Sequence, residues 1–138
     1  MRVFMEIQNF KEKAEKKVAT FPYKGNPMPV KDVWVRWLSQ AGPDSNSPDY
    51  GLRYFRIGPR GEIPIHKHFY FQTMYILKGV SIVCRHDPET DAKTDQRQVG
   101  ANDFIFVPSM EPHSMSNPSE SEDLEFLCCI ANVYGEGQ

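Results

Sequence analysis

The sequence predicts an all-β domain, either a sandwich or a small barrel. Nine glycines and eleven prolines are spread along the 138 residues, and short runs rich in β-branched and aromatic residues lie between them. Eight or more strands at this spacing are typical of a sandwich or small barrel. We expect one domain over residues 1–138, because two independent cores would each be too small in a chain of this length.

The one predicted helix lies near the N-terminus, within residues 1–20. Four apolar residues recur there at helical spacing, namely Ile7, Phe10, Ala14 and Val18. Glu12 and Lys16 form a favourable i,i+4 pair, and Pro22 ends the segment. We therefore expect a short helix before the first strand.

The predicted strands follow one another quickly across residues 30–134, where we expect the β-barrel. They are residues 33–38, 52–57, 63–69, 72–77, 80–85, 96–99, 103–107, 113–116 and 124–133. Gly58–Gly61 is predicted to be a turn, and so is the charged segment Asp87–Asp95. The last strand is the longest and most apolar. Both of its faces are apolar, so alternation does not show which one points inward.

Charge and cysteine content exclude several classes of function. The net charge is -2, so no basic excess exists to neutralise nucleic acid or an anionic membrane. No segment approaches the roughly 20 apolar residues that span a bilayer, and the N-terminus lacks the apolar run of a signal peptide. We therefore expect a cytoplasmic protein without nucleic-acid or membrane partners. The cysteines, Cys84, Cys128 and Cys129, form no CxxC motif and are expected to be reduced thiols.

Three of the four histidines are placed so that they can share one metal ion. His66 and His68 are separated by one residue on a predicted strand, so their side chains point to the same face. Gln72 follows within reach, and His113 comes from a distant strand. Metal sites commonly combine local and distant ligands in this way. The alternative for each histidine is a surface or hydrogen-bonded core residue, and we interpret His86, beside a predicted turn, as exposed.

The sequence around these histidines resembles the two signatures of the cupin superfamily. From Gly61 to Gly79 it reads G-x4-HxH-x3-Q-x6-G, where the usual pattern is G-x5-HxH-x3-E-x6-G. From Pro108 to Asn117 it reads P-x4-H-x3-N, which resembles P-x-G-x2-H-x3-N. The main departure is Gln72, which stands where most cupins carry a glutamate ligand. Within this superfamily the chain is similar to small single-domain archaeal and bacterial cupins, some of which have four histidine ligands.

This resemblance implies a cupin-type double-stranded β-helix, which is a jelly-roll barrel, and a homodimer. It implies the metal ligands His66, His68, Gln72 and His113. The alternative for Gln72 is a polar residue that hydrogen-bonds in the pocket without touching metal. The resemblance also favours Phe126 and Cys128 as pocket-lining residues.

Three further residues, Tyr54, Arg56 and Tyr75, are candidates for a proton relay or a carboxylate clamp in the pocket. Alternation does not choose among them, and no catalytic residue is assigned.

Three neutral imidazoles and a neutral amide leave a bound ion with its full charge. We therefore expect one divalent transition metal (Mn, Fe, Ni, Zn or Cu) and a small anionic molecule at its open positions. The favoured function is an enzyme of dioxygenase type that acts on a small enolisable or carboxylate-bearing molecule. The alternatives are a lyase or isomerase, a non-catalytic metal-dependent sensor or carrier, and a scaffold that has lost its metal.

Overall fold

The computed structural model describes residues 4–43 and 46–131. These residues form one 3-10 turn and nine strands, so the predicted all-β class is confirmed. The elements are η1 (Phe10–Glu12), β1 (Lys16–Tyr23), β2 (Asn26–Ser39), β3 (Tyr50–His66), β4 (Gln72–Lys78), β5 (Val80–His86), β6 (Lys93–Gly100), β7 (Phe104–Val107), β8 (His113–Ser116) and β9 (Leu124–Ala131). None of the described helical segments is long and apolar enough to cross a membrane.

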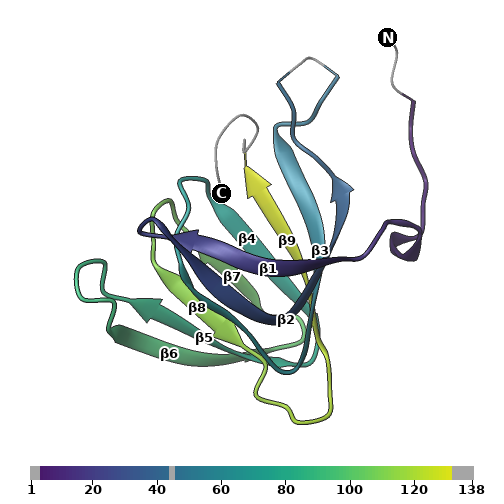
Figure 1. Ribbon diagram of the computed structural model, residues 1–138. Coiled ribbons are helices and arrows are strands. Elements are labelled where there is room, and N and C mark those ends of the chain that lie inside the picture. Colours follow the sequence, from purple (N-terminus) through teal and green to yellow (C-terminus); the bar gives the residue numbers. More distant parts are fainter. Residues whose placement is uncertain (1–3, 44–45, 132–138) are drawn as a thin grey trace.

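The strands form one antiparallel sheet that curls into an open barrel (Figure 1). Along the sheet the order is β6-β5-β8-β3-β9-β4-β7, and the β1–β2 hairpin joins it through β2 and β3. β3 is central because it pairs with β2, β8 and β9. In Figure 1 the β1–β2 hairpin lies across the front of the barrel.

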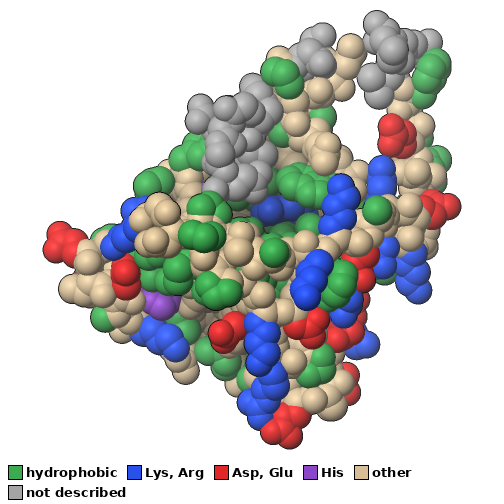
Figure 2. All heavy atoms as spheres, viewed as in Figure 1, with side chains coloured by type: hydrophobic (Ala, Val, Ile, Leu, Met, Phe, Trp, Pro, Cys, Tyr) green, Lys and Arg blue, Asp and Glu red, His purple; other side chains and the backbone are tan. Residues whose placement is uncertain are grey.

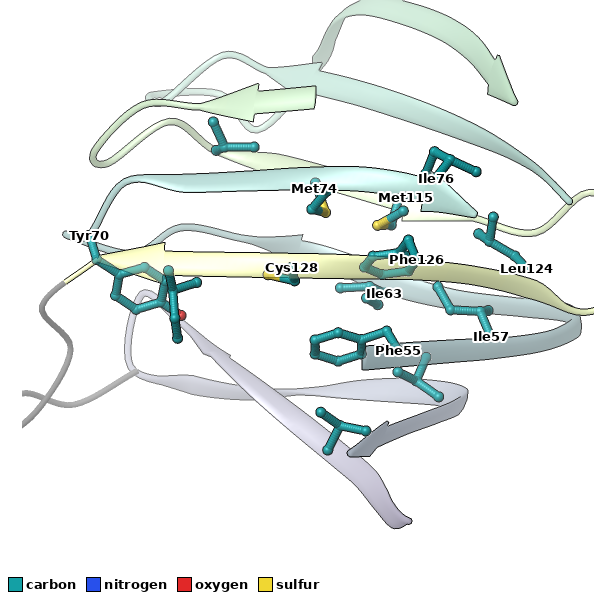
Figure 3. Packing of buried hydrophobic residues seen from close by; sticks show 14 residues of the cluster. Phe55, Ile57, Ile63, Tyr70, Met74, Ile76, Met115, Leu124, Phe126 and Cys128 are labelled. Carbon is teal, nitrogen blue, oxygen red and sulfur yellow. The ribbon is translucent and has the colours of Figure 1, made fainter. Parts of the chain in front are cut away.

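The core lies on the inner face of this curled sheet (Figure 3). On β9, alternate side chains are buried, namely Leu124, Phe126, Cys128 and Ile130. The Phe126 ring stacks on that of Phe55 with centroids 5.2 Å apart. Fully burying such a side chain contributes about 1.5–3 kcal/mol. Burial thus settles which apolar face of β9 points inward, and Cys129 lies on the exposed one.

The predicted N-terminal helix is reduced to one 3-10 turn, capped by the reciprocal pair Asn9 and Glu12. The residues after it form β1, which pairs with β2 from Lys16 to Tyr23. Pairing with a neighbouring strand therefore outweighs the helical spacing of the apolar residues. β2 accordingly begins at Asn26, earlier than the predicted first strand.

β3 runs through the predicted turn at Gly58–Gly61 without ending. The chain is irregular there, since Arg60 has a φ of 62°. A Cβ on Gly61 would lie 2.7 Å from the carbonyl oxygen of Lys31, so this close approach requires glycine. β3 ends at His66, and the second histidine of the HxH motif lies just beyond it.

Two other boundaries differ from the prediction. The charged segment Asp87–Asp95 is a turn only in its first part, because β6 already begins at Lys93 and pairs with β5. Asp87 organises that turn by accepting hydrogen bonds from the backbone amides of Glu89 and Thr90. The described part of β9 ends at Ala131, and residues 132–133 of the predicted last strand lie outside the described residues.

The surface mixes acidic, basic and apolar side chains on the face seen in Figure 2. Exposed aromatic rings gather on the outer side of β4 and β7. Phe104 and Phe106 are 68% and 56% exposed, and they alternate with the inward-facing Ile105 and Val107. Phe71 stacks on Phe106 with ring centroids 6.0 Å apart. This ring cluster borders one end of the sheet, because β7 pairs only with β4 among the described strands.

Candidate metal centre

Three buried histidines converge inside the barrel. His66 ends β3 and pairs across the ladder with His113 at the start of β8, while His68 lies two residues beyond His66. One ring nitrogen of each lies within 4.8 Å of the other two. The side chains therefore come together although His68 is not on the strand where it was predicted. The antiparallel register of β3 and β8 produces this meeting, because it sets two residues far apart in sequence directly opposite one another.

Backbone carbonyls fix the same tautomer in all three rings. The Nδ1 atoms of His66, His68 and His113 lie 3.0, 3.0 and 2.8 Å from the carbonyl oxygens of Pro64, Tyr70 and Glu111. A neutral imidazole in this position donates its Nδ1–H to the carbonyl and keeps a free lone pair on Nε2. This is the arrangement that orients histidines toward a metal ion.

Burial keeps these rings neutral. Desolvation lowers the pKa of His113 to about 4. It also lowers the pKa of His66 well below its usual value, with help from the nearby His113, and lowers that of His68. Each ring is therefore available as an uncharged donor at neutral pH.

Gln72 joins the cluster from the start of β4. Its Oε1 lies 2.9 Å from Nε2 of His68, and its Nε2 donates to Sγ of Cys128 over 2.7 Å. Because Nδ1 of His68 carries the proton, its Nε2 and the amide oxygen are two lone-pair atoms side by side. Two ligands of one ion with bonds of about 2.1 Å, at right angles, lie about 3 Å apart. The donor set therefore fits a metal ion held by three imidazoles and an amide oxygen.

The cavity around these four side chains also contains residues that the sequence analysis missed. It is lined by Arg53 and by aromatic and apolar side chains, and no carboxylate lines it among the described residues. The ring of Phe21 stacks on His66 at 4.8 Å, and that of Tyr70 stacks on His68 at 4.1 Å. Phe21 was missed because the first part of its strand, β1, lies in the segment that was predicted to be helical.

The three residues proposed for a relay or clamp lie elsewhere. On β3, Phe55 faces the core, so Tyr54 and Arg56 on either side of it lie on the opposite face of the sheet, where Tyr54 is buried against the ring of Phe10. Arg56 pairs there with Glu15 at 2.9 Å. Tyr75 is 42% exposed on the outer side of β4. None of the three lines the cavity. The same alternation rule, applied from Phe55, would have selected Arg53 in place of Arg56.

Phe126 lines the cavity, whereas Cys128 borders it through its bond to Gln72. All three cysteines are free thiols, as predicted. His86, in contrast, is buried rather than exposed. Its Nδ1 lies 2.9 Å from the carbonyl oxygen of Asp91 and its Nε2 lies 2.8 Å from Oγ of Ser114. Both ring nitrogens are engaged, so His86 has a structural role outside the cluster.

Comparisons with known proteins agree with this architecture. The structure is similar to that of a cupin-2 domain protein, Rru_A2000 from Rhodospirillum rubrum, with 21% sequence identity and a TM-score of 0.66. The match covers 100% of this chain and 80% of that protein. It is similar to the polyketide cyclase RemF from Streptomyces resistomycificus, with 20% identity, a TM-score of 0.67, and 95% and 87% of the two chains covered. It is also similar to a single-residue variant of oxalate decarboxylase from B. subtilis, with 18% identity, a TM-score of 0.63, and 94% and 31% covered.

These likenesses show the shared fold. No curated protein sequence matches the chain. A family model described as a cupin domain, Cupin_2, matches residues 53–130, which is more than half of the chain and includes all four candidate ligands. The chain therefore belongs to the cupin-2 family of cupin domain proteins.

Proposed function

We propose that this protein is an enzyme that holds one divalent transition metal and acts, by dioxygenase-type chemistry, on a small enolisable or carboxylate-bearing molecule. The observation that carries the proposal is the convergence of His66, His68 and His113, each with its Nδ1 engaged by a backbone carbonyl. A buried cluster of neutral imidazoles with free Nε2 lone pairs is suited to a borderline transition metal such as Mn, Fe, Ni, Zn or Cu.

The ligand set determines what such an ion offers. When bound, it supplies Lewis-acid stabilisation of negative charge on a substrate, with open positions for a substrate and for dioxygen. The protein ligands are all neutral, so they leave the charge of the ion uncompensated. Gln72 contributes an amide oxygen, which is a weaker donor than a carboxylate. Its NH2 group is held by Cys128, and this orients the oxygen toward the histidines.

Space for a substrate lies beside the histidines. A groove of about 610 Å³ opens between β5–β6 and β7, and His113 lines both this groove and the histidine cavity. Val83 and Arg85 pair with Met115 and His113 of β8, so they face the same side of the sheet as that histidine. The groove gives the non-reacting part of a substrate a path to the candidate metal centre.

Lyase or isomerase chemistry is the second candidate. It uses the same stabilisation of enolate charge. The fold is shared with a polyketide cyclase and an oxalate decarboxylase, so it accommodates reactions other than dioxygenation. If the protein binds metal and a small ligand but shows no turnover, it is a non-catalytic sensor or carrier.

The first test is elemental analysis of protein purified without chelator. We expect close to one equivalent of a transition metal per chain, lost in His66→Ala and kept in the matched control His86→Ala. Circular dichroism establishes that both variants are folded. Iron or manganese would lead to oxygen-uptake assays with diketones and enols, while zinc or nickel would favour a lyase, an isomerase or a sensor. Absence of metal after reconstitution would contradict the proposal.

The partners follow from the same reasoning. We propose a small-molecule ligand, a cytoplasmic location and a homodimer, with no nucleic-acid or membrane partner. The ring cluster of Phe71, Phe104 and Phe106 supports the homodimer, since large exposed apolar patches commonly mark an interface.

A further inference from the structure

One cation inside the barrel has no acidic partner among the residues that the structure describes. Arg53 of β3 is 4% exposed and lines the same cavity as the histidines. Its Nη2 donates to Sγ of Cys128 over 3.0 Å, and its buried Nε has no hydrogen-bond partner among the described residues. No carboxylate in the described part of the chain forms an ion pair with it. Burying a charge in this way is unfavourable unless another group compensates it.

The protein keeps the guanidinium in place with aromatic rings. Its central carbon lies 5.3 Å from the ring centroid of Trp37 and 4.9 Å from that of Phe55. Cation–π contacts of this kind offset part of the burial cost and hold the plane of the group. Arg53 is therefore held in a fixed position with hydrogen-bonding capacity left unused.

The charge balance of the cavity points the same way. The described residues that line it include a guanidinium and neutral imidazole and amide groups, but no carboxylate. A divalent ion held by His66, His68, Gln72 and His113 would add two further positive charges in a site of low dielectric constant. Such a site favours binding of an anion, because like charges that are not compensated repel strongly at short range.

We propose that Arg53 forms an anion subsite next to the metal centre and that it binds the carboxylate group of the substrate. This inference rests on the proposed function and narrows its substrate class to small carboxylates. A guanidinium fork matches the two oxygens of a carboxylate. The cavity itself has an open volume of about 20 Å³, room for one or two water-sized groups, and its other walls are largely apolar. These limits favour a compact, planar monoanion over a phosphate.

Formate is the probe, since it is the smallest carboxylate, and formamide is its neutral counterpart. Binding is measured by calorimetry on the full chain, with and without one equivalent of metal. We expect formate to bind and formamide not to bind. We expect Arg53→Gln to weaken formate binding about tenfold or more while retaining its metal, because the arginine is not a ligand. Arg53→Lys keeps the charge but loses the two-pronged guanidinium group. Its formate affinity should therefore lie between those of the unaltered protein and Arg53→Gln.

Arg36→Gln is the matched control. Arg36 also has a buried unpaired Nε, but it lies outside the cavity and forms an ion pair with Glu15. The Arg36→Gln variant should bind formate with the same affinity as the unaltered protein. Equal formate affinity in the unaltered protein and in folded Arg53→Gln would overturn the subsite, and so would equal binding of formamide.

The two proposals fail separately in this experiment. If the unaltered chain takes up no metal, the proposed function is wrong. Even then, formate should bind the metal-free chain weakly, and Arg53→Gln should weaken this binding further. If metal binds but Arg53→Gln leaves the formate affinity unchanged, the metal centre stands and the anion subsite is wrong. Circular dichroism shows whether Arg53→Gln folds, and Arg53→Lys supplies the comparison if it does not.

Discussion

The ring of Phe21 lies almost parallel to the imidazole of His66, with centroids 4.8 Å apart and an interplanar angle of 13°. Phe21 comes from β1 and His66 from the end of β3. The N-terminal hairpin is therefore a wall of the candidate metal centre. It shields one side of a histidine whose carbonyl-bound Nδ1 already fixes its orientation.

Replacing Phe21 with alanine should loosen the site without removing a ligand. We expect Phe21→Ala to retain one equivalent of metal but to release it faster, because water gains access to His66. The partial burial of Phe21 predicts a loss of about 1–2 kcal/mol in the free energy of unfolding. Chelator-chase kinetics and urea unfolding measure the two effects. Complete loss of metal in a folded variant would mean that the hairpin positions the ligand rather than covers it.

Gln72 can be tested as a ligand by changing its donor strength. Gln72→Glu supplies a carboxylate where the amide oxygen lies beside Nε2 of His68, so it should raise metal affinity by about tenfold or more. Gln72→Ala should lower the affinity. Competition with a chromophoric chelator gives both constants. Unchanged affinity in Gln72→Ala would establish the alternative, in which the amide only hydrogen-bonds to Cys128.

Acid should destabilise the metal-free protein through its buried histidines. Desolvation lowers the pKa of His113 to about 4 in the folded state, whereas an exposed histidine in the unfolded chain titrates near 6.5. Below about pH 6.5 the unfolded state binds the proton first, so the free energy of unfolding falls as the pH falls. For His113 alone the loss is about 3 kcal/mol by pH 4. Urea unfolding at stepped pH measures this slope, and folded His113→Gln should show a shallower one.

Asn117 should contribute to stability without affecting the ligands directly. It is 2% exposed, and its Nδ2 lies 3.0, 3.1 and 2.8 Å from the carbonyl oxygens of Ile57, Gly58 and Glu122. Asn117→Ala leaves these buried carbonyls without their donor, which predicts a loss of about 2–4 kcal/mol in the free energy of unfolding. Folded Asn117→Ala should still bind one equivalent of metal. A loss of less than about 0.5 kcal/mol would contradict this account.

The proposed homodimer can be tested at the exposed rings of β7. Phe106→Lys places a charge beside Phe71 in the ring cluster, so it should shift the protein toward the monomer. Light scattering coupled to gel filtration measures the mass. Lys93→Glu, on the exposed edge of β6, is a control that should leave the mass unchanged. A dimer that survives Phe106→Lys would place the interface elsewhere.

The spacing of the sequence motifs predicted which polar side chains meet in the candidate metal centre, because it reflects the strands that carry them. HxH at His66 and a distant His113 meet because β3 and β8 pair in register. The hairpin was not predicted, since apolar spacing near the N-terminus fits a helix and only pairing with β2 decides for a strand. Arg53 was missed because a charged residue type does not show which face of a strand its side chain lies on. The face follows only when alternation is counted from a known core residue such as Phe55.

The central position of β3 has a consequence for the order in which the site is assembled during synthesis. β3 is complete at His66, but two of its neighbours, β8 and β9, begin only at His113 and Leu124. A chain emerging from the ribosome therefore carries the first two histidines of the candidate metal centre, and Gln72 soon after them, long before His113 and the strands β8 and β9 exist. Capture of the ion is expected only once residue 131 has been made. A chain halted before β8 would present His66 and His68 to solvent as a weak, unsheltered pair.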